Sequence, residues 1–564
     1  MTGEPSDAHN MTPQPRTRRR RALDAAIPRA LKMPPGHRDY TVIRGLRVPM
    51  RDGVELFTDV YEPVGQSLGT LLIRTPYGPT GPVALLSARY FATHGYQVVN
   101  QSCRGVFGSG GVFEPFGPDI DDGADTVAWL RNQEWFGGRF ALWGASYVGA
   151  TAWALMMDPP PELAAAVIAV SAHDNYWVTH GVGAFALDQT LGLLEALDHQ
   201  EQGGVVRRVM RGVTAGRRLK SGFEELPLVR AQDTVLAGSR MPYREWLTTP
   251  DAEDPLWRPM RLGQALERVN VPILLQEGWQ DPFLDQMLDQ YERLRRRGVD
   301  VGLTIGPWTH VQFATKGTGI VMDEALDWLA EHLAGTGRRR RPHPVHLFVR
   351  GAEEWRWLPE WPPAAAEHVL YLQPDGALGE AEPPRTASPS VCRYHPADPT
   401  PSVGGRMINP ATGGYRDNRE LEERDDVLTF TSPVLSEALE VIGVPVVELV
   451  HHTDNPNADL FVRLCDVSPK GRSINVSDGF RRLEPEKSHG TIEVRLDALA
   501  HRFAPGTRIR LQVSGGAHPR YARNLGTDKD PATSTELTPS RRTISHGDGG
   551  SSRILLPCPV ARQS

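Results

Sequence analysis

The apolar residues in the first part of this chain are gathered in short, nearly continuous runs. Such runs occur at residues 70–75, 140–143, 167–171, 271–276 and 301–305. This pattern is typical of strands that are buried on both faces of a parallel sheet. The run at 140–143 is followed by a small-residue stretch with helical character at 150–156. We therefore predict an α/β fold built on a parallel sheet.

The segment between that strand and that helix reads Gly-Ala-Ser-Tyr-Val-Gly, at residues 144–149. A serine on a sharp strand-to-helix turn needs small neighbours. Gly144 avoids a collision with the helix, and Gly149 lets the helix pack against the strand. The pattern is G-x-S-x-x-G, looser than G-x-S-x-G, so by itself it also fits an ordinary glycine-rich turn. Ser146 is a candidate nucleophile.

Two later runs also lead through a glycine to one ionisable residue. The run at 271–276 leads to Asp281, and the run at 301–305 leads to His310. Open parallel sheets place catalytic groups at the carboxyl ends of their strands, and the order Ser, Asp, His is that of an α/β-hydrolase. Singly, Asp281 fits a helix N-cap and His310 is one of 18 histidines. Jointly, Ser146, Asp281 and His310 predict a catalytic triad.

The chemistry of these groups predicts acyl transfer. His310 would take the proton of Ser146 during attack on a carbonyl carbon and return it to the leaving group, while Asp281 would orient the imidazole. The backbone N–H of Tyr147 would serve the oxyanion hole. Tyr77, in the loop after the strand at 70–75, offers a second donor. The alternative for Tyr77 is simple packing of its ring beside Pro76.

A set of motifs distributed along the chain carries a family resemblance. They are Met50-Arg51-Asp52-Gly53-Val54, Asp59-Val60-Tyr61-Glu62-Pro63, Arg74-Thr75-Pro76-Tyr77, Cys103-Arg104-Gly105, the segment 144–149, Gly278-Trp279-Gln280-Asp281 and Gly306-Pro307-Trp308-Thr309-His310. From about Tyr40 to about Gly526 the chain resembles the cocaine esterase / X-Pro dipeptidyl-peptidase (CocE/NonD) family of serine hydrolases. The resemblance implies the same triad and implies that the hydroxyl of Tyr77 belongs to the oxyanion hole.

Two departures from the family pattern bear on the local structure and the substrate. Ser102 stands where relatives often carry an acidic residue, which puts a local salt bridge of Arg104 in doubt. Relatives that act on α-amino acid esters place carboxylates just after the catalytic aspartate, whereas this chain has Pro282-Phe283-Leu284. We expect Phe283 to line a pocket for an uncharged acyl group. Trp279 is a second candidate for substrate contact, although tryptophans beside catalytic groups more often pack in the core.

Composition shifts predict four parts. Residues 1–38 are turn-rich and polar, with arginines at 18–21, and are expected to be a disordered basic tail. Residues 39–174 and 269–335 are expected to form the hydrolase core, and residues 175–268 a helical cap inserted into it. Residues 343–564 contain many short apolar runs and turn signals without helical period, which predicts a β-sandwich. The resemblance implies that this sandwich is a jelly roll.

Overall composition fits a large soluble enzyme. The chain has 564 residues and a net charge of −6. A protein with this charge has no overall positive potential to attract nucleic acid, so we do not expect a nucleic-acid-binding protein. Its four cysteines are scattered, and sparse usage fits a reducing compartment, so we expect a cytoplasmic protein. No apolar run is long enough to span a membrane. No cofactor or metal site is indicated, and a homo-oligomer is compatible with the sequence.

We expect a serine hydrolase that acts on a small-molecule ester or amide through an acyl-enzyme, with esters as the first choice. X-Pro dipeptidyl-peptidase activity is the main alternative, and it needs an anionic patch for a free amine. Acyl transfer to a nucleophile other than water also stays open, because a triad does not distinguish the two outcomes. A non-catalytic binding protein with an inactive hydrolase core is the non-enzyme alternative.

Overall fold

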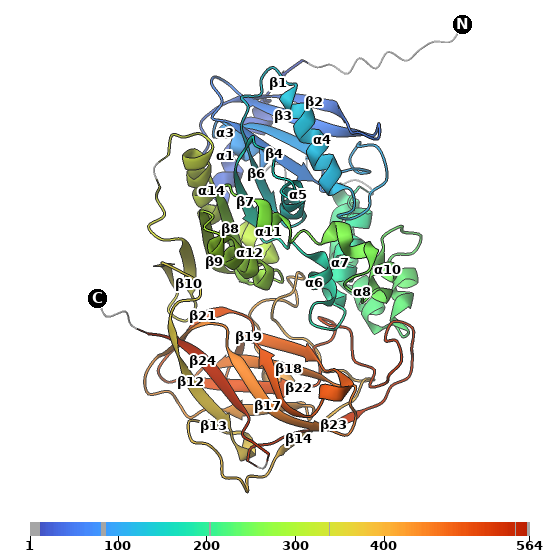
Figure 1. The fold of residues 1–564 in the computed structure, drawn as a ribbon, viewed down its shortest axis with the longest axis vertical. Helices are drawn as coiled ribbons and strands as arrows, with labels where there is room; N and C mark the ends of the chain where they lie inside the picture. Colours follow the sequence, from blue (N-terminus) through green and yellow to red (C-terminus); the bar gives the residue numbers. More distant parts are fainter. Residues whose placement is uncertain (1–11, 80–85, 202–204, 338, 548, 561–564) are drawn as a thin grey trace.

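An α/β part and an all-β part lie at opposite ends of the molecule, with a helical insertion beside their junction (Figure 1). The computed structural model describes residues 12–79, 86–201, 205–337, 339–547 and 549–560, and it describes only the backbone of residues 205–213 and 215. The α/β architecture with a C-terminal domain of antiparallel sheets is as predicted.

One sheet of eleven described strands runs through the α/β part, in the order β1-β2-β3-β5-β4-β6-β7-β8-β9-β10-β11. Strands β5 to β10 in this order are parallel, and antiparallel pairs add β3, β2 and β1 at one edge and β11 at the other. Their bounds are β1 (Gln14–Pro15), β2 (Tyr40–Pro49), β3 (Glu55–Pro63), β4 (Thr70–Thr75), β5 (Gln97–Ser102), β6 (Phe140–Ala145), β7 (Leu163–Ala169), β8 (Ile273–Gln280), β9 (Val301–Thr309), β10 (Val345–Val349) and β11 (Glu354–Leu358).

Helices cover both faces of this sheet, which explains its continuous apolar strands. In β4, Leu71 and Ile73 pack in the cluster that contains α3 and α14, whereas Leu72 packs in the cluster with α4, α5, α11 and α12. Successive side chains of a strand point to opposite faces, so both must be apolar. The helices are α3 (Ala88–Thr93), α4 (Asp119–Arg131), α5 (Tyr147–Leu155), α11 (Ala265–Arg268), α12 (Leu284–Arg296), α13 (His310–Gln312) and α14 (Thr318–His332).

Between β7 and β8 the chain leaves the sheet and forms the predicted helical insertion. Its helices are α6 (Asn175–His180), α7 (Leu187–His199), α8 (Val205–Glu224), α9 (Ala231–Val235) and α10 (Tyr243–Thr248), with 3-10 turns η1 (Leu228–Arg230) and η2 (Pro255–Met260). The leucines of α7 at 187, 191, 194 and 197 are buried inside the insertion. Toward the core, Trp246 stacks on Phe116 with ring centroids 6.4 Å apart.

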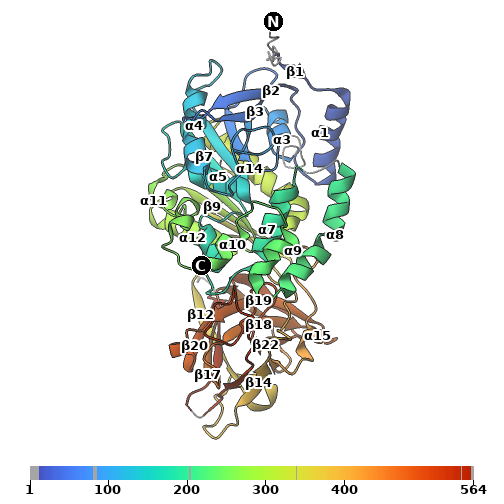
Figure 2. The same cartoon turned by 90° about the vertical axis from the view of Figure 1, so that its right-hand side faces the viewer.

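The insertion is held to the all-β part by main-chain hydrogen bonds. The N–H of Ala522 donates to the carbonyl oxygen of Phe185 at 2.8 Å, and the N–H of Val229 donates to Ala532 at 3.0 Å. A third bond runs from the N–H of Asp188 to the carbonyl oxygen of Pro519, at 2.9 Å. Figure 2 shows α7, α9 and α10 directly above this part. The insertion therefore contacts both ends of the molecule.

The all-β part is a sandwich of antiparallel sheets around one apolar core. A seven-stranded sheet faces a four-stranded one of β15, β22, β18 and β19, and β16 pairs with β21. The strands are β12 (Ala365–Leu372), β13 (Leu378–Gly379), β14 (Ser390–Tyr394), β15 (Val427–Thr431), β16 (Leu439–Gly443), β17 (Val446–Thr453), β18 (Asp459–Val467), β19 (Ser473–Arg482), β20 (Gly490–Arg495), β21 (Leu499–Phe503), β22 (Arg508–Ser514), β23 (Ser540–Ile544) and β24 (Arg553–Pro559); α15 (Arg419–Glu422) and the 3-10 turns η4 (Pro374–Gly376) and η5 (Pro485–Lys487) lie between them.

The prediction of a disordered tail is wrong for its described residues. Helix α1 (Arg18–Ala30) contains the arginine cluster, and β1 pairs with β2. The carboxylate of Asp24 is nearly buried and pairs with Arg16 at 3.1 Å and Arg89 at 2.5 Å. Asp24, which the sequence suggested to be solvent-exposed, therefore links α1 to Arg89 of α3. Residues 1–11 of the predicted tail lie outside the described part.

The assignment of residues 345–349 to the sandwich is also wrong. These residues form the predicted strand, β10, but it pairs in parallel with β9, and β11 pairs with it in turn. The sandwich therefore begins at β12. Short apolar strands of both sheets look alike in sequence, so the partner of β10 could not be predicted from its composition.

A chain of ion pairs, buried except at its end at Asp285, joins the sandwich to the hydrolase part. Asp478 lies between Arg463, at 2.6 Å, and Arg520, at 2.7 Å. Arg520 also lies 3.7 Å from Asp497, which pairs with Arg406. The guanidinium of Arg406 then binds Asp285 of α12 at 2.7 and 2.8 Å.

We predict that Asp478→Asn destabilises the protein much more than loss of an exposed pair. The side chain of Arg463 has no exposure, and removing one partner of a buried pair costs about 3–5 kcal/mol. Thermal unfolding followed by calorimetry measures the effect. The control is Arg131→Gln, whose exposed pair with Glu162 contributes about 0–1 kcal/mol. Equal unfolding temperatures for the two variants would contradict the prediction.

Candidate active site

Ser146 occupies the turn between β6 and α5 in a backbone conformation that side chains rarely adopt. Its φ is 59°, in the left-handed region that is strained for a residue with a Cβ. A Cβ on Gly144 would lie 2.3 Å from the carbonyl oxygen of Val148, and one on Gly149 would lie 2.5 Å from the Cβ of Ser171. Both glycines are therefore required by close approach, as the sequence pattern indicates.

The three predicted triad side chains meet at the carboxyl edge of the sheet. His310 begins α13 immediately after β9, and its Nε2 lies 3.0 Å from the Oγ of Ser146. Its Nδ1 lies 2.7 Å from the Oδ2 of Asp281, whose side chain is wholly buried. The other oxygen, Oδ1, accepts the backbone N–H of Phe283 at 2.9 Å. The arrangement can move a proton from a hydroxyl to an imidazole that a carboxylate orients.

Tyr77 and Tyr147 approach the same serine from two elements. The hydroxyl of Tyr77, in the loop after β4, is hydrogen-bonded to the Ser146 side chain and accepts the backbone N–H of Tyr147. Burial raises the pKa of Tyr77, so this hydroxyl keeps its proton and remains a donor. The two predicted oxyanion donors thus lie beside the nucleophile.

Beneath the serine turn lies a buried polar cluster that sequence reasoning missed. The carboxyl group of Asp119, the first residue of α4, is hydrogen-bonded to the hydroxyl of Tyr147 and to the thiol of Cys103. The Tyr147 oxygen also accepts the N–H of Phe116 at 2.6 Å. Burial raises the pKa of Asp119, of Tyr147 and of Cys103. Tyr147 is therefore held at its side chain as well as by its place in α5.

The same carboxyl group connects to the loop that carries Tyr77. Arg74, at the end of β4, lies 3.3 Å from Asp119 and donates to its carbonyl oxygen at 2.8 Å. Arg104 pairs with Asp122 and with Asp52, both at 2.6 Å, so it has carboxylate partners although Ser102 is not acidic. The missed signal is the pair of arginines on neighbouring strand ends.

Comparisons with known proteins show the family of the chain. The family model described as X-Pro dipeptidyl-peptidase (S15 family) matches residues 52–312, and that of the X-Pro dipeptidyl-peptidase C-terminal non-catalytic domain matches residues 338–555. A cocaine esterase of Rhodococcus sp. (strain MB1 Bresler) is 30% identical, over 92% of this chain and 99% of that protein. The chain belongs to the CocE/NonD family of serine hydrolases.

Another sequence relative and two solved structures also resemble this CocE/NonD hydrolase. A putative serine esterase of Mycobacterium bovis is 26% identical, over 86% of this chain and 92% of that protein. Among solved structures, an α-amino acid ester hydrolase superimposes with a TM-score of 0.77 at 24% identity, covering 92% of this chain and 96% of that one. An aminopeptidase from a marine sediment Thaumarchaeota archaeon has a TM-score of 0.77 at 23% identity, with coverages of 92% and 97%. These two structures establish a shared fold.

The two predicted substrate contacts of this hydrolase lie in different surroundings. The ring of Phe283 meets the His310 imidazole edge to face, with centroids 5.4 Å apart. Trp279 is instead 2% exposed, packs on Trp361 and donates its indole N–H to the carbonyl oxygen of Phe348 at 2.8 Å. The prediction for Trp279 is corrected, because no surface of its ring is left for a substrate.

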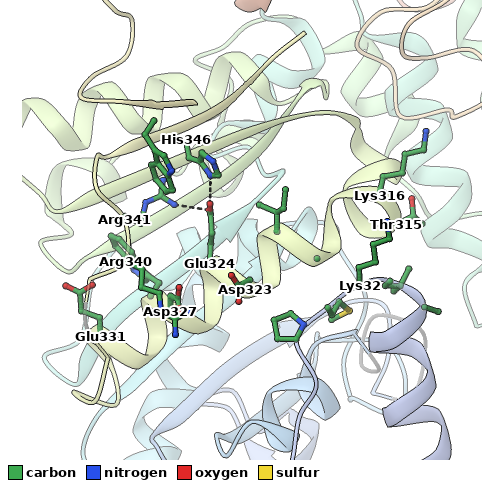
Figure 3. A pocket seen from close by; sticks show the side chains of 18 residues that line it. Lys32, Thr315, Lys316, Asp323, Glu324, Asp327, Glu331, Arg340, Arg341 and His346 are labelled. Atoms are coloured by element: carbon green, nitrogen blue, oxygen red, sulfur yellow. Dashed lines mark hydrogen bonds and ion pairs between the residues drawn. The ribbon is translucent and has the colours of Figure 1, made fainter. Parts of the chain in front are cut away.

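A cavity of about 1020 Å³ lies outside the triad of this family member, between residues 30–34 and α14. Figure 3 shows Glu324 on its wall, joined to Arg341 and His346. These contacts measure 2.8 and 2.5 Å. No triad residue lines the cavity, and the carboxylate of Glu324 is neutralised by its own neighbours. We assign the cavity no part in the reaction.

Neither a metal-binding cluster nor a membrane-spanning helix is found among the described residues of the hydrolase. No group of three or more His, Cys, Asp or Glu side chains there is arranged to hold a metal ion. Among the same residues, none of the helices has both the length and the apolar character needed to cross a membrane. The described cysteines are free thiols.

Proposed function

We propose that this hydrolase cleaves carboxylic esters of small molecules through an acyl-enzyme on Ser146. The observation that carries the proposal is the unbroken series of hydrogen bonds from Ser146 through His310 to buried Asp281, at 3.0 and 2.7 Å. A nucleophile, a base and an orienting carboxylate in this relation are what acyl transfer requires. General ester hydrolysis also agrees with the family of the chain.

The steps follow from the positions of the atoms. The Oγ of Ser146 attacks the carbonyl carbon while its proton passes to Nε2 of His310. The tetrahedral intermediate expels the alcohol, which takes the proton from Nε2, and leaves an acylated serine. Water then attacks the acyl carbon, gives its proton to Nε2, and the serine oxygen recovers that proton as the acid departs. Asp281 stabilises the imidazolium in both half-reactions.

The oxyanion is assigned to Tyr77 and Tyr147. In the free protein the hydroxyl of Tyr77 accepts the N–H of Tyr147 beside Ser146. A substrate carbonyl oxygen placed between them would accept from both donors, and it would do so most strongly once it bears negative charge. The cluster around Asp119 supports this assignment, because it anchors both tyrosines through Arg74 and the Tyr147 hydroxyl.

The acyl side of the substrate is assigned to the region of Phe283. This ring stands against the catalytic imidazole, where it suits an aromatic or alkyl acyl group. X-Pro dipeptidyl-peptidase activity remains the second candidate, because the matched family models carry that name. Transfer of the acyl group to a nucleophile other than water uses the same first half-reaction.

We expect a fluorophosphonate to label the protein covalently at Ser146, since the reagent reacts with serines that a base activates. Ser146→Ala should abolish both labelling and ester turnover, as measured by mass spectrometry and by an ester assay. Ser551→Ala, in the C-terminal sandwich, is the matched control and should behave as the wild type. A wild-type protein that stays unlabelled would refute the proposed mechanism.

Tyr77→Phe should lower kcat roughly 100-fold, because the variant keeps the ring and loses one oxyanion donor. Steady-state kinetics on an aryl ester measures the effect, with Tyr371→Phe in β12 as the control. A change in kcat of less than about threefold would reject the oxyanion role.

Aryl esters should be cleaved with a higher kcat/KM than Gly-Pro amides of the same leaving group. Near Phe283 the first residues after Asp281 carry no carboxylate, so the charged amine of a dipeptide lacks a partner there. Paired assays on the wild type decide the order. Faster cleavage of the amides would favour the peptidase.

A further inference from the structure

A second carboxyl group lies next to the triad and takes no part in the mechanism above. Glu277 is in β8, four residues before Asp281, and both side chains are wholly buried. Between them the chain turns, and the N–H of Asp281 donates to the carbonyl oxygen of Gly278 at 3.0 Å. The turn brings the two carboxyl groups into side-chain hydrogen-bonding contact.

We propose that Glu277 is a positioning residue: it retains a proton and donates it in a hydrogen bond to Asp281, which orients the triad carboxylate and moderates its attraction for the His310 imidazolium. The inference rests on the proposed serine hydrolase mechanism and adds a fourth residue to it.

The hydrogen-bonding partners of the two carboxyl groups decide which one carries the proton. Asp281 accepts two N–H groups, from His310 at 2.7 Å and from Phe283 at 2.9 Å. Glu277 accepts one, from Gly278 to its Oε1 at 2.8 Å. Its buried Oε2 receives no N–H or O–H donor from the described residues. A hydrogen bond between two carboxyl groups needs one proton, and the group with fewer donors keeps it.

The charges around Glu277 act in the same direction. Burial and the charge of Asp281 raise the pKa of Glu277 well above its ordinary value. Arg406, from the C-terminal part, is the cation that opposes this effect. Its guanidinium is already paired with Asp285 of α12 and with Asp497, and its effect on Glu277 is smaller than that of the Asp281 charge.

A hydrogen bond donated to Asp281 has a definite consequence for the base. It withdraws negative charge from the carboxylate that stabilises the imidazolium, so the attraction of Asp281 for the His310 imidazolium is weaker. Loss of the donor should leave Asp281 more negative and strengthen that attraction. If Glu277 were ionised, its negative charge would stabilise the imidazolium. Removing that charge would then destabilise the imidazolium, which is the opposite effect.

The test measures the second-order rate of fluorophosphonate labelling against pH for the full-length protein and two variants. Glu277→Gln keeps a donor in its amide, and we expect the acid limb of its profile to coincide with that of the wild type. Glu277→Leu lacks the donor, and its acid limb should move about half a pH unit higher. The position of the limb does not depend on the amount of folded protein, so a merely structural role would leave it unmoved.

Infrared difference spectra between the wild type and Glu277→Gln provide a readout without turnover. The carbonyl band of a protonated carboxylic acid should be present in the wild type at neutral pH and absent from the variant. An absent band, coincident limbs for all three proteins, or limbs that move to lower pH in both variants would each overturn the inference. A wild type that shows the band but is not labelled would instead refute the proposed function and leave the protonated Glu277 supported.

Discussion

The close approach of helix α5 to strands β6 and β7 is the constraint on which the site depends. A Cβ on Gly144 would collide with the backbone of Val148, and a Cβ on Gly149 would collide with the side chain of Ser171. The turn between them is then so short that Ser146 is forced to a φ of 59°. In this conformation the hydroxyl of Ser146 lies 3.0 Å from Nε2 of His310, and the next N–H, that of Tyr147, donates to the hydroxyl of Tyr77. The positions of both groups thus depend on how closely α5 packs against the sheet.

Two buried charge clusters keep the remaining groups in place around that turn. The first, centred on Asp119, lies under the serine and reaches the Tyr77 loop through Arg74. The second runs through the sandwich to the half-exposed Asp285 of α12, four residues after Asp281. Charges buried in this way constrain geometry more than they add stability, because each is costly unless its partner stays in position. The segments that carry Asp281, Tyr77 and Tyr147 are therefore each held by contacts with one of these two clusters.

The meeting of Ser146, Asp281 and His310 could be predicted because each residue follows a local pattern in the sequence: an apolar strand, a glycine and one reactive residue. The helical insertion and the antiparallel sandwich were accessible for similar reasons. Trp279 was not, since the register shift between Gly278 and Gln280 changes which way its neighbours point and has no local signature. The roles of Asp24 and Asp119 depend on arginines distant in sequence, so only the folded chain reveals that these carboxylates are buried.

The attachment of the helical insertion to the sandwich affects which sequence changes the protein can tolerate. Its attachments to the sandwich include three bonds between peptide groups, at Phe185, Asp188 and Val229, and these do not require any particular side chain. Side-chain substitutions in the insertion can therefore accumulate without breaking these three attachments. A scaffold of this kind can vary in one segment while the arrangement of Ser146, Asp281 and His310 stays unchanged.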